Sequence, residues 1–194
     1  MRLVSLYRQS GAMTRLRCSQ ILACPFFLPV RRKVKPSLRT LVLCYGNPDR
    51  QDDGVAFHIM VRLARELGYI LPDPSENDRQ PCRRSPDLMF VLQLSPELAK
   101  TLAQFDRICF VDAHSGQMTQ DIVWQELKGE YQASPLTHHI APATCLSLIR
   151  TLYNRQPEAV LVSIRGYEFD FSHSLSPQTA CLAEQALQRI LAWL

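Results

Sequence analysis

The sequence lacks several features that would place it quickly in a structural class. Its seven cysteines are odd in number and none of them forms a Cys-x-x-Cys pair, so they do not read as a disulfide framework. The longest apolar stretch, residues 21–30, is too short to span a bilayer and is interrupted by Pro25 and Pro29. We therefore expect reduced cysteines, a cytoplasmic location and no membrane association.

Acidic residues are absent from the first 48 positions, and this absence explains the formal net charge of +4. Nine basic residues precede Asp49, the first acid, so the rest of the chain is net acidic. Basic and aromatic residues are not interleaved as they are in proteins that bind single strands, so a nucleic-acid partner is not expected. We expect residues 1–38 to be a basic, disordered extension and residues 39–194 to form a single α/β domain.

From residue 39 onward, short apolar runs alternate with amphipathic stretches, which predicts an α/β sandwich. Strands are expected at 41–45, 88–94, 107–111, 121–127 and 159–164, of which 121–127 alternates in polarity like a half-exposed antiparallel edge strand. Helices are expected at 55–67, from Ser95 to about Gln104, at 142–153, and after Ser176, with residues 71–87 as a surface loop. The pattern predicts a mostly parallel, five-stranded twisted sheet with one antiparallel edge strand.

The loop after the first predicted strand is the most informative segment. No Gly-x-Gly-x-x-Gly motif is present, and two adjacent acids would repel a pyrophosphate, so no nucleotide cofactor is expected. Ligands of open α/β sheets bind at the carboxyl ends of parallel strands, which is where this loop lies. Asp52 is positioned to cap the following helix, and both acids can simply favour its start. The loop reads Gly46, Asn47, Pro48, Asp49, Arg50, Gln51, Asp52, Asp53, Gly54.

Two further segments supply side chains that bind metals. Asp112 follows a run of apolar strand residues and is expected at the same sheet edge as the first loop, although an acid there can also serve only a turn. His138 and His139 precede a helix, and single histidines in such loops are usually surface groups. Two carboxylates and one imidazole would suit a borderline divalent cation such as nickel or zinc and would leave coordination positions open.

These motifs, in this order, resemble those of the hydrogenase maturation endopeptidases. The resemblance rests on Leu-Val-Leu-x-x-Gly-Asn-Pro-x-x-x-Asp-Asp-Gly-Val, Val-Asp-Ala at 111–113, His-His-x-x-Pro at 138–142 and Leu-Ser-Pro at 175–177. It covers residues 39–194. Many relatives have glycine where Cys44 stands, which concerns the packing of that strand end and not the ligands.

The resemblance implies a three-layer α/β/α fold and three metal-contacting side chains, Asp53, Asp112 and His138, with His139 as the alternative histidine. It further implies an endopeptidase that removes the C-terminal extension of a nickel-iron hydrogenase large-subunit precursor, using nickel supplied by that precursor for recognition. A non-catalytic module that senses or delivers nickel is the alternative, and an unrelated hydrolase or phosphate-ester enzyme is a third reading. No base is identifiable for Cys44 or Ser115, so a covalent nucleophile is not expected.

Overall fold

The computed structural model describes residues 38–69, 85–128 and 140–194, which belong to one compact unit, Pro36–Leu194. Its centre is a five-stranded sheet with the strand order β2-β1-β3-β5-β4. The strands are β1 Thr40–Tyr45, β2 Asp87–Val91, β3 Arg107–His114, β4 Ile122–Leu127 and β5 Glu158–Arg165. The helices are the 3₁₀ helix η1 Gln51–Gly54, α1 Val55–Glu66, α2 Leu98–Leu102, α3 Pro142–Tyr153 and α4 Pro177–Trp193. Apart from Leu38, the predicted N-terminal extension lies outside the described residues.

The sheet is parallel except at one edge. β1 pairs in parallel with both β2 and β3, and β3 pairs in parallel with β5. β4 is antiparallel to β5 and its side chains are half-buried or exposed, as the alternating polarity of its sequence predicted. Four parallel strands and one antiparallel edge strand therefore confirm the predicted sheet.

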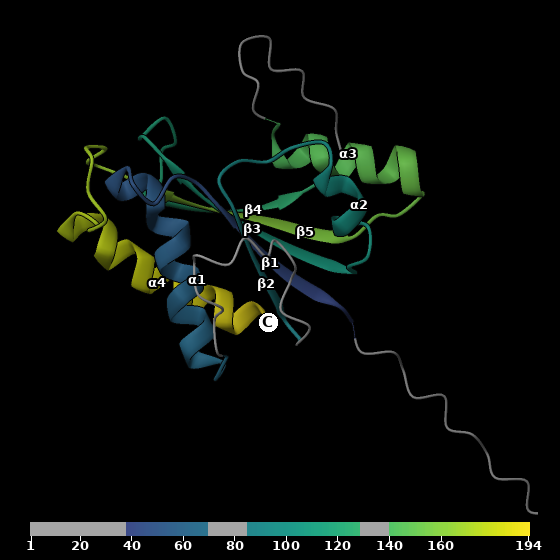
Figure 1. Ribbon diagram of the computed structural model, residues 1–194, viewed down its shortest axis with the longest axis horizontal. Coiled ribbons are helices and arrows are strands. Elements are labelled where there is room, and N and C mark those ends of the chain that lie inside the picture. Colours follow the sequence, from purple (N-terminus) through teal and green to yellow (C-terminus); the bar gives the residue numbers. More distant parts are fainter. Residues whose placement is uncertain (1–37, 70–84, 129–139) are drawn as a thin grey trace, which may run out of the picture. The chain divides into compact units, whose positions relative to one another are not determined.

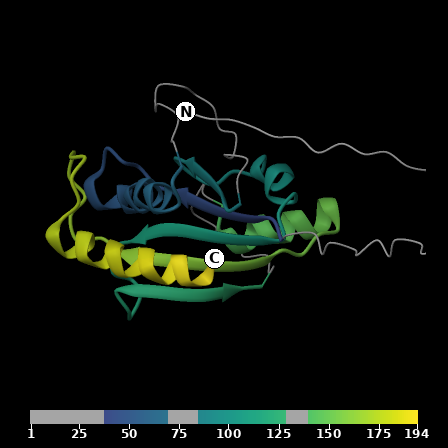
Figure 2. The same ribbon diagram turned by 90° about the horizontal axis from the view of Figure 1, so that it is seen from below.

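Helices cover both faces of the sheet, because successive side chains of a strand point to opposite sides. Val42 and Cys44 of β1 belong to the core that packs against α1 and α4, whereas Leu41 and Leu43 belong to the core beneath α2 and α3. Figure 1 shows these two helix pairs on either side of the sheet, and Figure 2 shows α4 running along its face. The three-layer α/β/α architecture is confirmed, and it buries the free cysteines Cys44, Cys109 and Cys145 as apolar filler.

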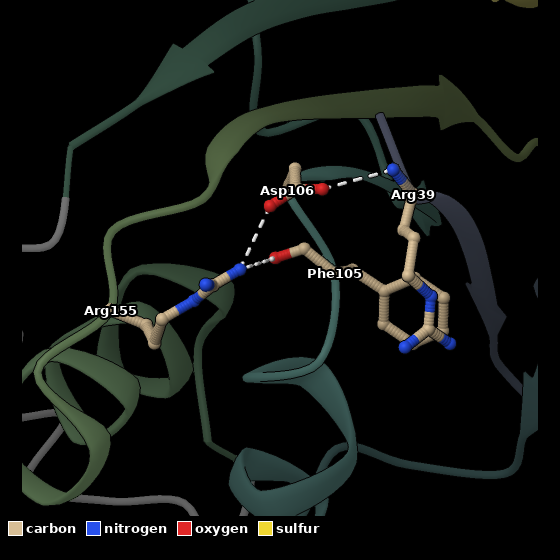
Figure 3. Close-up of polar contacts among 4 residues, drawn as sticks. All are labelled: Arg39, Phe105, Asp106 and Arg155. Carbon is tan, nitrogen blue, oxygen red and sulfur yellow. Dashed lines mark hydrogen bonds and ion pairs between the residues drawn. The ribbon is translucent and has the colours of Figure 1, made fainter. Parts of the chain in front are cut away.

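A polar cluster joins the layers at the amino ends of the strands (Figure 3). Asp106 accepts hydrogen bonds from the backbone N–H of Arg39, at 3.0 Å, and from the guanidinium of Arg155, at 2.8 Å. The guanidinium of Arg39 also lies over the ring of Phe105, 4.8 Å from its centroid. These contacts hold β1, β3 and the segment after α3 together at the amino ends of the strands. The loops at the carboxyl ends of the strands take no part in them.

Several boundaries differ from the predictions, most of them by one residue, and the larger differences concern β2 and β3. β2 ends at Val91 and not at residue 94, because Tyr45↔Val91 is the last pair that β1 offers, and it begins at Asp87, which was predicted to be loop. β3 continues past Asp112 to His114 because β5 pairs with it that far.

The start of α2 also differs, because the backbone N–H of Leu98 bonds to the carbonyl of Ser95 in a tight turn. The N-cap is therefore Glu97, and Ser95, where the helix was predicted to begin, lies in the turn before it. Within the described ranges, no helix is both long and apolar enough to cross a membrane.

Candidate functional site

Asp53 and Asp112 lie on neighbouring elements at the carboxyl edge of the sheet. β1 and β3 are adjacent strands, paired up to Cys44↔Val111, so the loop after β1 lies beside the end of β3. Both carboxylates line one cavity of about 570 Å³. The residues that line it are Tyr45, Gly46, Asn47, Arg50, Asp53, Leu92, Gln93, Leu94, Asp112 and Ile140. The structure therefore brings together two of the three predicted metal-contacting side chains.

The loop after β1 is folded back on itself so that Asp53 is held at the cavity. The backbone N–H of Asn47 donates to Oδ2 of Asp53 at 3.1 Å, and the Asn47 side-chain oxygen accepts from the N–H of Asp49 at 3.0 Å. The second of these bonds is the local turn that an asparagine in this position favours. Asp53 is thus oriented by the loop's own backbone.

Gly46 and Gly54 provide the close approaches that this loop needs. Gly46 has φ +139°, and a Cβ on it would lie 2.2 Å from the carbonyl oxygen of Asp53. A Cβ on Gly54 would lie 2.7 Å from Cα of Pro48. These distances are too short for any side chain, which explains why glycine stands at both positions of the motif.

Replacing Gly46 by alanine is therefore expected to lower the free energy of unfolding by about 3 kcal/mol or more, because backbone strain and a steric clash combine. Gly68→Ala is the matched control: Gly68 also has positive φ, at +68°, but its Cβ would meet nothing within 4 Å. That control should cost only about 1–2 kcal/mol. Chemical denaturation of both variants measures the difference, and equal losses would contradict the clash.

Asp112 is a half-buried carboxyl on the wall of the cavity. Burial raises its pKa, the hydrogen bond from the Tyr45 hydroxyl and that from the backbone N–H of Ala113 lower it, and the nearby charge of Asp53 raises it again. The result is a pKa of about 7. Tyr45, at the last position of β1, was not among the predicted site residues, and its partnership with Asp112 follows from the pairing of β1 with β3.

The sequence had suggested that Asp52 caps the following helix, but the structure shows that it does not. Neither η1 nor α1 has a side-chain cap, and Asp52 is instead fully buried under the connection between β5 and α4. Its carboxylate accepts five hydrogen bonds of 2.7–2.9 Å, from the backbone N–H groups of Tyr167, Glu168 and Ser176 and from the hydroxyls of Ser176 and Thr179. Burial opposes its ionisation, but these bonds outweigh burial and hold the pKa of Asp52 below its usual value.

His138 and His139 lie outside the described residues, so the third predicted ligand is still a prediction. Ile140, which follows them directly in the sequence, lines the cavity. Among residues 38–69, 85–128 and 140–194, no group of three His, Cys, Asp or Glu side chains could hold a metal ion. Among the described residues that line the cavity, Arg50 is the one basic residue, and it was not among the predicted site residues.

No protein-family model and no curated protein matches the chain. Solved structures do match. The hydrogenase maturating endopeptidase HybD from E. coli is similar with a TM-score of 0.58 and 23% identity, over 81% of this chain and 92% of that one.

Two further matches come from Thermococcus kodakarensis. Its [NiFe] hydrogenase maturation protease HybD is similar with a TM-score of 0.55 and 20% identity, over 80% of this chain and 99% of that one. Its [NiFe] hydrogenase maturation protease HycI is similar with a TM-score of 0.54 and 18% identity, over 79% of this chain and 90% of that one. The fold that the motifs implied is thereby confirmed: the chain is folded like the hydrogenase maturation endopeptidases.

Proposed function

We propose that this protein is an endopeptidase that removes the C-terminal extension of a nickel-iron hydrogenase large-subunit precursor. The supporting observation is the meeting of Asp53 and Asp112 in one cavity, at the carboxyl edge of a fold shared with proteins named as hydrogenase maturation proteases. The motif order of the sequence points to the same activity. The free thiols of the described cysteines suit a cytoplasmic location.

The recognised metal is the nickel that the precursor already carries, so it belongs to the substrate. Asp53 and Asp112 supply two carboxylate ligands, and His138, two residues before the cavity-lining Ile140, supplies an imidazole. Carboxylate and imidazole ligands suit a borderline divalent ion, and three protein ligands leave coordination positions for the precursor's own groups. Binding the nickel in this way fixes the adjoining peptide in the cavity.

Cys44, the described cysteine that lies next to a cavity-lining residue in the sequence, does not fit the role of a nucleophile. Cys44 comes directly before Tyr45 but is completely buried, and burial raises the pKa of its thiol well above the usual value. Because the thiolate is the reactive form, this thiol is inert. The proposal therefore assigns no nucleophilic role to Cys44 and takes water as the attacking group in the hydrolysis.

The proposal predicts that the purified protein shortens nickel-loaded precursor by one defined C-terminal peptide and leaves nickel-free precursor intact. Intact-mass measurement of both incubations decides this. A protein that only senses or delivers nickel would bind the precursor and leave its mass unchanged. Cleavage of nickel-free precursor at the same rate would contradict nickel-guided recognition while keeping the protease.

The same assay assigns the histidine. His138→Ala is expected to lose processing, and His139→Ala is expected to retain most of it. The reverse result would move the assignment by one residue. Equal activity of both variants and the unchanged protein would remove histidine from the proposed ligand set.

A further inference from the structure

The connection between β5 and α4, residues 166–175, carries an exposed aromatic side chain on a fixed backbone. Phe171 is 94% exposed, the highest value among the exposed large hydrophobic residues that the structure describes. Single exposed hydrophobic residues are common on protein surfaces and by themselves mean little. What distinguishes Phe171 is how firmly the segment on either side of it is held.

The backbone of 166–175 is hydrogen-bonded to the loop after β1 at two places, one before Phe171 and one after it. The N–H of Gln51 donates to the carbonyl of Ser172 at 2.8 Å, and the N–H of Ser172 donates to the carbonyl of Asp49 at 3.2 Å. Before Phe171, the N–H groups of Tyr167 and Glu168 donate to the buried Asp52 carboxylate. Figures 1 and 2 both show this connection beside the start of α1.

The two aromatic residues before Phe171 point in different directions. The ring of Phe169 turns inward, so close to Gly166 that a Cβ on that glycine would lie 2.6 Å from it. Tyr167 is held outside, with the guanidinium of Arg165 4.9 Å from its ring centroid. The residues before and after Phe171 are thus held in place, and its ring stands exposed.

The segment that carries Phe171 is connected to the candidate site through Arg50. Arg50 forms a β-bridge with Ser172, the residue after Phe171, and Arg50 also lines the cavity that holds Asp53 and Asp112. On another part of the cavity wall, Leu92 is a second hydrophobic side chain with 67% exposure. Two exposed acids, Glu168 and Asp170, come just before Phe171 in the sequence.

We propose that Phe171 is the anchor of a docking surface for the folded body of the substrate protein, outside the peptide that enters the cavity. This inference rests on the proposed function for the identity of the partner, the large-subunit precursor. The chemistry it requires of that partner is an apolar pocket that takes the ring, with a basic side chain near its edge to match the exposed acids Glu168 and Asp170 that precede Phe171. A rigid aromatic loses little conformational entropy on binding, so it suits the role of an interface hot spot.

Phe171→Ser is expected to weaken binding of nickel-loaded precursor about 10- to 100-fold, the range of a buried aromatic anchor. KM for processing should rise with the dissociation constant, while kcat stays within about twofold, because the residue lies outside the cavity lining. The readouts are biolayer interferometry with immobilised precursor and processing kinetics. Because Phe171 is exposed, the variant should keep its thermal stability.

Leu152→Ser is the matched control, since Leu152 is 63% exposed and lies near the C-terminal end of α3, toward the edge of the sheet opposite to the cavity. It should bind and process like the unchanged protein. Equal affinity of the Phe171 variant and this control would overturn the docking surface and leave the protease intact. A protein that binds precursor through Phe171 without cutting it would keep the surface and reject the protease.

Two other outcomes would also overturn the inference. If the unchanged protein neither binds nor processes the precursor, both proposals fail together. If light scattering shows that Phe171→Ser converts an oligomer into a monomer, the ring serves contact between copies of this chain and not the precursor.

Discussion

Asp52→Asn is expected to lower the free energy of unfolding by about 3–5 kcal/mol, since a buried charge network loses its central acceptor. An asparagine can accept with one oxygen only, and its amide N–H groups would face donors that surround the present carboxylate. The hydroxyls of Ser176 and Thr179 can rotate, but the backbone N–H groups of Tyr167 and Glu168 cannot. For a domain of this size the melting temperature should fall by roughly 10 °C.

The control for this variant is Asp49→Asn in the same loop, whose side chain is 66% exposed and should change stability by less than about 0.5 kcal/mol. The pH dependence adds an independent check. Because the pKa of Asp52 is lowered in the folded protein, its contribution is present above the unfolded pKa of about 4 and is lost as pH falls through the lower native value. The difference between the unchanged protein and Asp52→Asn should therefore shrink below about pH 4, and a constant difference would contradict the network.

The fold was predictable because local patterns carry most of its information. Apolar runs of strand length, separated by amphipathic segments, predicted all five strands, and the alternating polarity of residues 121–127 identified the antiparallel edge. Where boundaries failed, the cause was pairing between distant segments. β2 stops because β1 stops, and β3 continues because β5 is there to pair with it, and neither limit is visible in the strand's own sequence.

The candidate site was predictable only in part. Asp53 and Asp112 were expected together because neighbouring parallel strands end at one sheet edge, and both line the cavity. The predicted helix-capping role of Asp52 was wrong because its hydrogen-bond partners lie 115–127 positions away in the sequence. A rule that considers only the residues near a helix start does not include them. Tyr45 and Phe171 were missed for a related reason: hydrogen bonding to Asp112 and exposure on a fixed loop are both properties of the assembled fold.

Asp112→Asn is expected to abolish processing while making the protein more stable at neutral pH. Processing should fall at least about 100-fold, since a neutral amide is a poor substitute for a carboxylate on a borderline divalent ion. Stability should rise because the variant removes a half-buried, poorly solvated charge and retains an oxygen that can accept from the Tyr45 hydroxyl. A carboxyl whose ionisation lowers the stability of the fold is expected at a functional site, where activity and not stability accounts for its presence.

The sign of this effect follows from the two pKa values of the group. The pKa of Asp112 is about 7 when folded, against 3.8 for the ordinary carboxyl. The folded state therefore holds the proton more tightly, and the stability of the unchanged protein decreases as pH rises between those values, by up to about 4 kcal/mol. The gain from Asp112→Asn should consequently be near zero at pH 4 and largest at pH 8.

Denaturant titrations at several pH values measure this gain, with Glu66→Gln, an exposed acid on α1, as the control that should show no such trend. The same protonation should act on processing by the unchanged protein, because nickel requires the ionised carboxylate, so its rate should decline as pH falls below about 7. A variant that loses processing but is no more stable at pH 8 than at pH 4 would mean that Asp112 is already charged without cost. Asp112 would then be well solvated in the folded protein, although its role in the site would remain.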